Sequence, residues 1–401
     1  MNDQTLYCSG GPDDGFHFLS LPAQNLNKDL FYCSGGNNDG FHFLTSAVQP
    51  LNYQTLFCLG GNNDGFHFLA VSPYSMNDQT LYCSGGPDDG FHSLSLPAFQ
   101  FGRGIWRGVT NYSWTEPSNW TGNSVPDVTT DVVIPPMCSF YPSITTGILT
   151  IADNGGDYKC NSLTINNGGS LNNDRYMYAY GEVTISGQYI ATNDLDNTIV
   201  LYPGSHLIIA STGLMKVGNQ GSGTSGKSDF RMDGGMLEIS GGTLEIDDQF
   251  NLLGGNLTMT GGTLFAHKHG SGTGYSSAAP GAFHVAASAT GTISGGTVKV
   301  VGRANNNDSV AVKINSPTFA FSGSSVLEFT QGVNARSDNP ELRVVPGVSL
   351  NHLTVNAPSR VVMIGSDATF NGKVTIYPLS TLRINPGKNV TVADSLILKN
   401  Y

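Results

Sequence analysis

Cysteine and histidine recur in phase near the start of the chain, and both residue types can bind metal ions. Each returns every 25 residues, together with a phenylalanine. A zinc site needs about four ligands converging on one point, whereas a regular array spreads equivalent side chains along an axis. We therefore favour rows that pack between repeats over a zinc site. The residues of these rows are Cys8, Cys33, Cys58 and Cys83; His17, His42, His67 and His92; and Phe16, Phe41, Phe66 and Phe91.

The repeat cysteines have two interpretations. Neighbours could form disulfides, Cys8 with Cys33 and Cys58 with Cys83, as an extracellular chain permits. Each could equally be a buried thiol, because free cysteine packs as a small apolar residue. Equivalent side chains of stacked units point in parallel directions, which is unfavourable for disulfide geometry and slightly favours the thiol.

Two further cysteines, Cys138 and Cys160, lie outside the array. In an extracellular chain they are the simplest disulfide pair. The sequence therefore predicts a Cys138–Cys160 bridge.

A glycine-flanked polar loop separates the cysteine from the histidine in each repeat. Its oxygens suit calcium, which takes about six to eight oxygen ligands. The alternative is an ordinary turn, because turns also use Asn, Asp and Gly. Neighbouring loops would have to share an ion, since each supplies few ligands. The candidate calcium ligands are Asp13, Asp14, Asn38, Asp39, Asn63, Asp64, Asp88 and Asp89.

All the tryptophans, Trp106, Trp114 and Trp120, lie between residues 100 and 136. One interpretation is a cap, because a terminal repeat must cover the exposed first coil of a solenoid. The other is a carbohydrate-binding platform on which the indole rings stack on sugars. We favour the cap.

His267, His269 and His284 lie beside or within a Gly/Ser-rich insertion at residues 270–287. Insertions in a solenoid emerge as loops, which often bind ligands. Histidines at i and i+2 on a strand face the same side, so a weak metal site is one interpretation. Solvated polar residues are the alternative that we favour.

The repeats predict strands joined by tight loops. Apolar Leu6, Tyr7 and Cys8 precede the polar loop, and alternating apolar residues follow it. We therefore expect residues 1–99 to form four β-hairpins that pack against one another. Residues 1–17 recur word for word as residues 76–92, and no signal-peptide pattern precedes them. We therefore expect a piece of a longer array.

From residue 137 onward, short alternating strands are separated by Gly-Gly or Asn-Gly. Alternation predicts one buried and one solvated face. Gly-Gly pairs ending at Gly235, Gly242, Gly255 and Gly262 are spaced 7, 13 and 7 residues apart, so the pattern repeats every 20 residues. We predict a right-handed parallel β-helix over residues 137–401.

Composition narrows the functional classes. Charged residues make up 12% of the chain, the formal net charge is −11, and Lys and Arg total 19. Nucleic-acid binding requires clustered basic residues, so we expect no nucleic-acid partner. No apolar run reaches the roughly 20 residues of a transmembrane helix. Nucleophile, P-loop and dinucleotide motifs are also missing from the sequence.

The tryptophan segment has a recognisable pattern. It consists of Trp106-Arg-Gly, Trp114-Thr-Glu-Pro-Ser-Asn-Trp120, Val125-Pro126 and Asp131-Val-Val-Ile-Pro135. With the preceding G-G-x-x-D-G-F repeats and the following Gly/Asn/Thr-rich solenoid, it resembles large secreted surface proteins of Bacteroidota. Members of that group are typically exported by the type IX secretion system and include adhesins and gliding-associated filaments. Ser309 and Ser395 lie in Asp-Ser-apolar tripeptides that resemble the O-glycosylation acceptor of the same group.

We predict an all-β extracellular protein with a hairpin array at 1–99, a tryptophan-rich junction at 100–136 and a parallel β-helix at 137–401. The expected role is structural and non-catalytic: a segment of a surface filament, stalk or adhesin that associates with itself through edge strands. A carbohydrate-binding adhesin module with surface polysaccharide as partner is the alternative. A polysaccharide-active β-helix enzyme is a weaker alternative. Calcium is the one candidate cofactor.

Overall fold

The chain forms two compact units, Met1–Phe101 and Gly102–Tyr401. A computed structural model describes the strands of the first unit, and residues 104–400 except 193–197, 219–228, 269–280, 303–309 and 333–338. The tryptophan segment belongs to the second unit, together with the β-helix.

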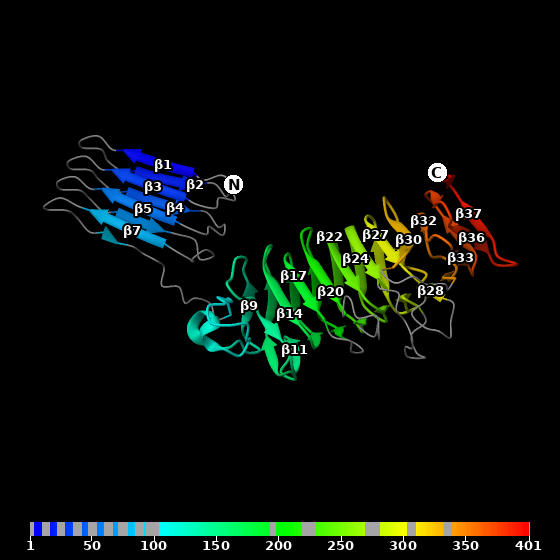
Figure 1. Cartoon of the computed structure of the whole chain (residues 1–401), viewed down its shortest axis with the longest axis horizontal. Coiled ribbons are helices and arrows are strands. Elements are labelled where there is room, and N and C mark those ends of the chain that lie inside the picture. The colour runs from blue at the N-terminus through cyan, green and yellow to red at the C-terminus, as the bar shows by residue number, and fades with distance from the viewer. Residues whose placement is uncertain are drawn as a thin grey trace. The chain divides into compact units, whose positions relative to one another are not determined.

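The first unit consists of two parallel sheets (Figure 1). Equivalent residues of successive repeats lie opposite one another, so Cys8 pairs with Cys33 in one sheet and His17 with His42 in the other. One sheet contains β1 (Gln4–Ser9), β3 (Asp29–Ser34), β5 (Gln54–Leu59) and β7 (Gln79–Ser84). The other contains β2 (His17–Leu21), β4 (His42–Ser46), β6 (His67–Ala70) and β8 (His92–Ser93).

The predicted hairpins are therefore wrong, although the predicted strands are present. The two strands of a repeat belong to different sheets, and each pairs in parallel with its equivalent in the next repeat. A hairpin would have paired them with each other in antiparallel fashion. Nearly identical repeats favour stacking, because each strand then has neighbours with the same apolar pattern.

The second unit is a parallel β-helix, as predicted. Most coils supply two strand segments to a 17-stranded sheet, the broad sheet, and one to an 11-stranded sheet, the narrow sheet; the last coils supply one strand to each. Figure 1 shows the coils succeeding one another from β9 in cyan to β37 in red. The right-handed sense of the coil stays a prediction.

The strands of the broad sheet are, in chain order, β9 (Asp131–Ile134), β10 (Ser143–Ile144), β13 (Ser162–Ile165), β14 (Ser170–Asn173), β16 (Glu182–Ile185), β17 (Gln188–Ala191), β19 (His206–Ile209), β20 (Leu214–Val217), β22 (Met236–Ile246), β24 (Asn256–Ala266), β26 (Thr290–Ile293), β27 (Thr297–Val300), β29 (Ala320–Phe321), β30 (Val326–Thr330), β32 (His352–Asn356), β35 (Val374–Ile376) and β38 (Leu396–Leu398).

The strands of the narrow sheet are β11 (Ile148–Ile151), β12 (Tyr158–Cys160), β15 (Tyr176–Ala179), β18 (Ile199–Leu201), β21 (Phe230–Met232), β23 (Phe250–Leu252), β25 (Phe283–Val285), β28 (Val310–Ile314), β31 (Glu341–Val344), β33 (Val361–Ile364) and β36 (Thr381–Ile384). A two-stranded sheet pairs β34 (Ala368–Phe370) with β37 (Val390–Val392).

The 20-residue glycine rhythm corresponds to one coil. Met236 of β22 pairs with Asn256 of β24, and Thr243 pairs with Thr263. At the corners, a glycine of one coil lies very close to the backbone of the glycine in the preceding coil. Gly262 has a φ of +79°, and a Cβ atom on it would lie 2.1 Å from the carbonyl oxygen of Gly242. Only glycine fits such a corner without strain or displacement of the next coil.

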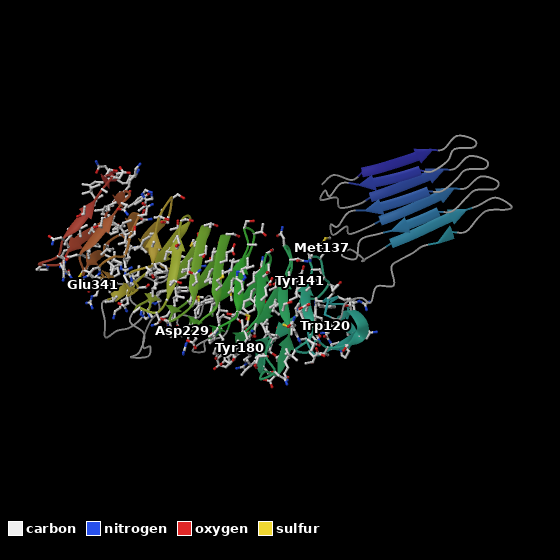
Figure 2. All side chains as sticks on the ribbon, turned by 180° about the vertical axis from the view of Figure 1, so that it is seen from behind. Trp120, Met137, Tyr141, Tyr180, Asp229 and Glu341 are labelled. Atoms are coloured by element: carbon white, nitrogen blue, oxygen red, sulfur yellow. The ribbon has the colours of Figure 1, made fainter. Side chains whose placement is uncertain are left out.

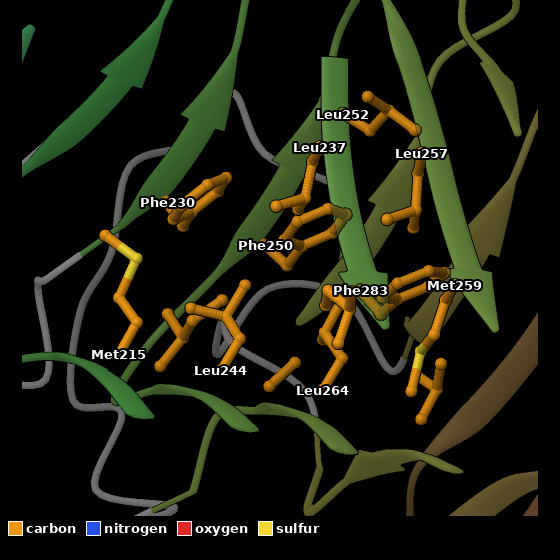
Figure 3. Close-up of a cluster of buried hydrophobic side chains, with 14 of the residues drawn as sticks. Met215, Phe230, Leu237, Leu244, Phe250, Leu252, Leu257, Met259, Leu264 and Phe283 are labelled. Atoms are coloured by element: carbon orange, nitrogen blue, oxygen red, sulfur yellow. The ribbon is translucent and has the colours of Figure 1, made fainter. Parts of the chain in front are cut away.

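The core is a stack of apolar side chains inside the coils. In the narrow sheet, Phe230, Phe250 and Phe283 occupy the same register position on successive strands. Their rings stack, with centroids 5.6 Å and then 5.3 Å apart (Figure 3). All three side chains are fully buried, as are Leu237 and Leu257 of the broad sheet. Burial of this continuous apolar column is the main force holding the coils together.

Candidate functional site

The tryptophan segment covers the first coil of the β-helix. Ile105 bridges to Val133 of β9, and Ser113 bridges to Ser143 of β10. Two short 3-10 turns, Pro117–Asn119 and Thr121–Asn123, return the chain across the end of the solenoid. This segment, residues 104–123, is called the tryptophan cap below.

The three indoles form one buried cluster. Trp106 and Trp120 meet edge to face with centroids 4.8 Å apart, and so do Trp114 and Trp120. The exposed fractions of Trp106, Trp114 and Trp120 are 0, 1 and 0%. Trp106 Nε1 donates a 2.7 Å hydrogen bond to the Phe140 carbonyl, and Trp120 Nε1 donates a 2.6 Å hydrogen bond to the Trp114 carbonyl.

This burial agrees with the interpretation of a cap and makes the sugar platform wrong. A sugar ring can stack only on an aromatic face that solvent reaches, and these faces contact protein instead. Asn119 fixes the cap further, since its Nδ2 donates to the carbonyls of Asn111 and Ser113 over 2.9 and 3.1 Å.

The predicted Cys138–Cys160 disulfide is wrong, because both thiols are free. Cys160 is fully buried in β12, opposite Ile151. The half-buried Cys138 follows β9, and its Sγ lies 3.6 Å from the Pro135 carbonyl and 3.8 Å from that of Trp106. Burial raises the pKa of Cys138 to about 11. Burial, with a smaller contribution from Asp131, also raises the pKa of Cys160. Neither thiol has the thiolate character of a nucleophile.

The repeat cysteines and histidines form two separate rows of backbone positions. Cys8, Cys33, Cys58 and Cys83 are in register in one sheet. His17, His42, His67 and His92 are in register in the other sheet. The stacked rows agree with the expected array, and the disulfide or thiol state of the cysteines stays a prediction.

Several candidates lie outside the described residues. They are Phe16, Phe41, Phe66, Phe91 and Ser309; His269; and all the proposed calcium ligands, Asp13, Asp14, Asn38, Asp39, Asn63, Asp64, Asp88 and Asp89.

We favoured solvated histidines beside the insertion, and this prediction is wrong for the two that the structure describes. His267 is fully buried at the end of β24, with Nδ1 3.4 Å from the Gly302 carbonyl. His284 is buried in β25 and lies in register with Asn251 and Lys313 of the adjacent strands. Burial and, less strongly, the Lys313 ammonium lower the pKa of His284 to about 4. Among the described residues, no group of three or more His, Cys, Asp or Glu side chains could hold a metal ion.

Ser395 is half-buried just before β38, and its carbonyl accepts a 2.9 Å hydrogen bond from the Val374 amide. The preceding Asp394 is exposed. Glycosylation of this serine stays a prediction.

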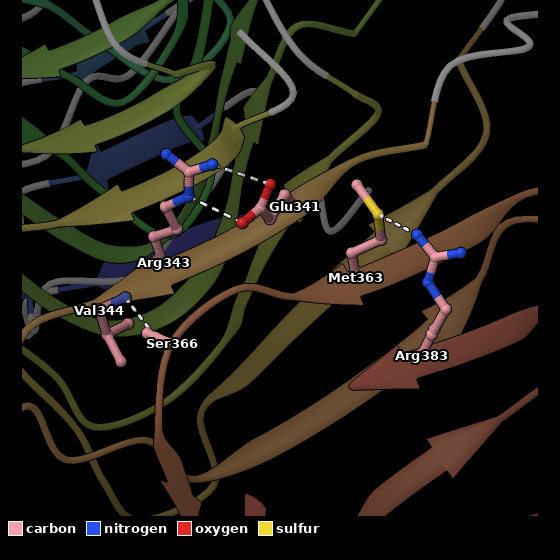
Figure 4. A network of polar contacts seen from close by, with 6 residues as sticks. All are labelled: Glu341, Arg343, Val344, Met363, Ser366 and Arg383. Atoms are coloured by element: carbon pink, nitrogen blue, oxygen red, sulfur yellow. Dashed lines mark hydrogen bonds and ion pairs between the residues drawn. The ribbon is translucent and has the colours of Figure 1, made fainter. Parts of the chain in front are cut away.

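Charged side chains on the solenoid form ion pairs within the chain (Figure 4). Buried Glu341 accepts two hydrogen bonds from Arg343, at 2.7 and 3.1 Å. Lys268 Nζ lies 2.6 Å from Glu245 Oε2. In each pair the opposite charges neutralise one another. No helix in the described part of the chain is long and apolar enough to cross a membrane.

The last coil of the solenoid, at the end opposite the tryptophan cap, has exposed strands and is called the open end below. Strands β36, β37 and β38 pair with β33, β34 and β35 on one side, and no further strand pairs with them among the described residues. Leu396 is in register with buried Val374, and Ile384 with buried Ile364. These core-column residues are nevertheless exposed: Ile384 by 46%, Leu396 by 59% and Leu398 by 65%.

Sequence reasoning missed a row of half-buried tyrosines on the outer side of the narrow sheet. Tyr176, Tyr178, Tyr180 and Tyr202 contact one another there. The i, i+2 spacing of the first three in a strand was the available signal.

Comparisons with protein-family models, with curated proteins and with solved structures found no match to this chain.

Proposed function

We propose that the protein is a structural, non-catalytic segment of an extracellular surface filament or stalk, and that its copies associate end to end. The open end of the solenoid is the observation that carries this proposal. The core columns continue into β36 and β38, where Ile384, Leu396 and Leu398 are exposed, and among the described residues no strand pairs with the outer edges of these strands. Such edges are templates for pairing with another chain.

The asymmetry of the solenoid supports a directional contact. The tryptophan cap closes one end, so the two solenoid ends are not equivalent. Pairing of the open solenoid end with a strand edge of the repeat array in the next copy is a head-to-tail contact, and such a contact gives a filament when it does not close.

Location outside the cell is part of the proposal. The low charge content of 12% and the type IX-like sequence pattern favour it. Export by the type IX secretion system is also part of the proposal.

Charge substitution at the open end tests this function. Leu396→Lys combined with Leu398→Lys should abolish filaments, because the two ammonium groups cannot be buried between copies without a large desolvation cost. The measurements are negative-stain electron microscopy and sedimentation velocity on the full chain.

A matched control places the same charges at the capped end. Val109 and Met137 are exposed by 53% and 63%, so Val109→Lys with Met137→Lys changes similar side chains. The control should assemble like the unmodified chain. Monomers of the unmodified chain at all concentrations, or equal assembly of both variants, would contradict end-to-end association.

A further inference from the structure

The tyrosine row lies on the outer side of the narrow sheet near the capped end. Tyr176 and Tyr178 belong to β15, and Tyr180 follows it directly. Side chains alternate along a strand, and the intervening Met177 and Ala179 are fully buried in the core. The tyrosines therefore point away from the core. Figure 2 shows Tyr180 on the same side of the solenoid as Asp229 and Glu341, which also belong to the narrow-sheet part of their coils.

The rings form one continuous aromatic surface across two neighbouring coils. Tyr180 and Tyr202 stack with centroids 4.4 Å apart and an interplanar angle of 2°. Tyr178 meets Tyr202 edge to face at 6.0 Å, and Tyr176 lies 5.9 Å from Tyr178. All four side chains are half-buried, so each keeps part of its surface in solvent. A contiguous, partly exposed aromatic surface of this kind is a candidate interaction site.

The surroundings of the row are polar, and three cationic side chains there are held by acceptors of this chain. Lys159 Nζ donates to Asn154 Oδ1 over 2.8 Å. Arg175 Nε donates to the Thr145 carbonyl over 2.8 Å, and Arg231 Nε donates to Asp233 Oδ1 over 2.6 Å. Nearby cations are thus engaged by acceptors of this chain. An acidic polymer needs cations directed toward it, so this surface does not suit one.

The phenol groups can donate hydrogen bonds at neutral pH. Burial raises the pKa of both Tyr178 and Tyr180, and neighbouring Tyr202 adds to the effect in each case. The hydroxyls therefore stay protonated and can both donate and accept.

The aromatic character is confined to these coils. Further along the same outer column of the narrow sheet, Tyr178 and Val200 are followed by Arg231, Asn251, His284 and Lys313. The aromatic surface therefore has a defined boundary and does not extend along the sheet.

We propose that the tyrosine row is a binding site for a neutral polysaccharide. Sugar rings have apolar C–H faces that stack on the negative faces of aromatic rings, while their hydroxyls form hydrogen bonds with phenol, amide and hydroxyl groups. An extended chain of neutral sugars can contact the outward ring faces and edges of this contiguous aromatic surface, and the polar rim can bond its hydroxyls. This site is independent of end-to-end association, because it lies on the side of the solenoid.

Calorimetric titration of the full chain with neutral hexasaccharides tests the proposal. The probes are hexamers of β-linked glucose, mannose and xylose, and an acidic oligogalacturonate serves as the charged comparison. At least one neutral hexamer should bind, more tightly than the oligogalacturonate. Tyr178→Ala and Tyr202→Ala should each raise its Kd about fivefold, since one aromatic contact contributes on the order of 1 kcal/mol.

Two control variants separate binding from folding. Tyr377→Ala removes a tyrosine that is 38% exposed outside the row, and it should leave Kd unchanged. Tyr178→Phe keeps the ring and should retain most of the binding. Failure of every neutral hexamer to bind, tighter binding of the oligogalacturonate, or equal effects of Tyr178→Ala and Tyr377→Ala would overturn the proposal. Loss of filaments instead of glycan binding in Tyr202→Ala would identify the row as a contact between copies and would also overturn it.

Discussion

The imidazole of His284 is a basic group held neutral inside the narrow sheet. An unfolded histidine titrates near pH 6.5, whereas burial and Lys313 lower the pKa of His284 to about 4. Between these pH values the unfolded state binds more protons than the folded state. The free energy of unfolding should therefore fall as the pH drops from about 6.5 to 4, by about 2 to 3 kcal/mol.

The substitution His284→Gln isolates this contribution. The groups facing the imidazole are Asn251, Asn315 and Lys313. Urea denaturation of both proteins at several pH values should give a smaller acid loss for the variant. Parallel profiles between pH 6.5 and 4 would show that His284 does not titrate there.

The sequence predicted where some residues lie in the fold, but not which residues they contact. The indole cluster was expected at the start of the solenoid, and it lies there. Sequence spacing carried no information about the distance between Cys138 and Cys160, because their separation depends on how the chain turns after β9. The sequence also did not reveal that His267 and His284 are buried, because alternation identifies the face of a sheet on which a side chain lies but not which residues cover that face.

At the scale of a strand and its corner, glycine sets how closely neighbouring coils can stack. Gly262→Ala should destabilise the solenoid by about 3 kcal/mol or more, because it adds a clash with Gly242 to the cost of a positive φ. Gly387 has a φ of +75°, yet nothing lies within 4 Å of a Cβ atom there. Gly387→Ala should therefore cost only about 1 kcal/mol.

Thermal denaturation followed by circular dichroism measures both variants. The difference between them reports the steric contribution, because the two glycines share the same backbone region. Equal losses of stability would mean that the coils can separate enough to admit a methyl group.

The strand pattern predicted the β-helix but not the pairing within the repeats. In the solenoid, Gly-Gly pairs at a 20-residue interval gave the coil length directly, as the pairing of Met236 with Asn256 confirms. In the repeats, a strand, a polar turn and a second strand fit either a hairpin or the corner of a coil. Local residues do not distinguish these cases, because the choice depends on stacking between repeats.

For the solenoid as a whole, the tryptophan cap should contribute more to stability than its short length suggests. Trp120→Ala removes two edge-to-face contacts and the hydrogen bond to the Trp114 carbonyl. We expect a loss of about 3 to 5 kcal/mol, the usual cost of deleting a buried indole. Because each coil contacts mainly its neighbours, damage at one end propagates inward.

Urea denaturation of Trp120→Ala and Tyr112→Ala provides the comparison. Tyr112 belongs to the same segment but is 57% exposed, so its loss should cost less than about 1 kcal/mol. Similar midpoints for the two variants would show that the indole cluster does not hold the first coil.

The difference between the closed and open ends of the solenoid gives it a mechanical direction. Under a pull along the axis, the coil at the open end pairs with a neighbour on one side only among the described residues, so separation should begin there. Coils would then peel toward the tryptophans one at a time, each 20-residue coil releasing about 60 Å of slack. In the stalk proposed above, such a solenoid would yield in steps under load and absorb a sudden force before the tryptophan cap is strained.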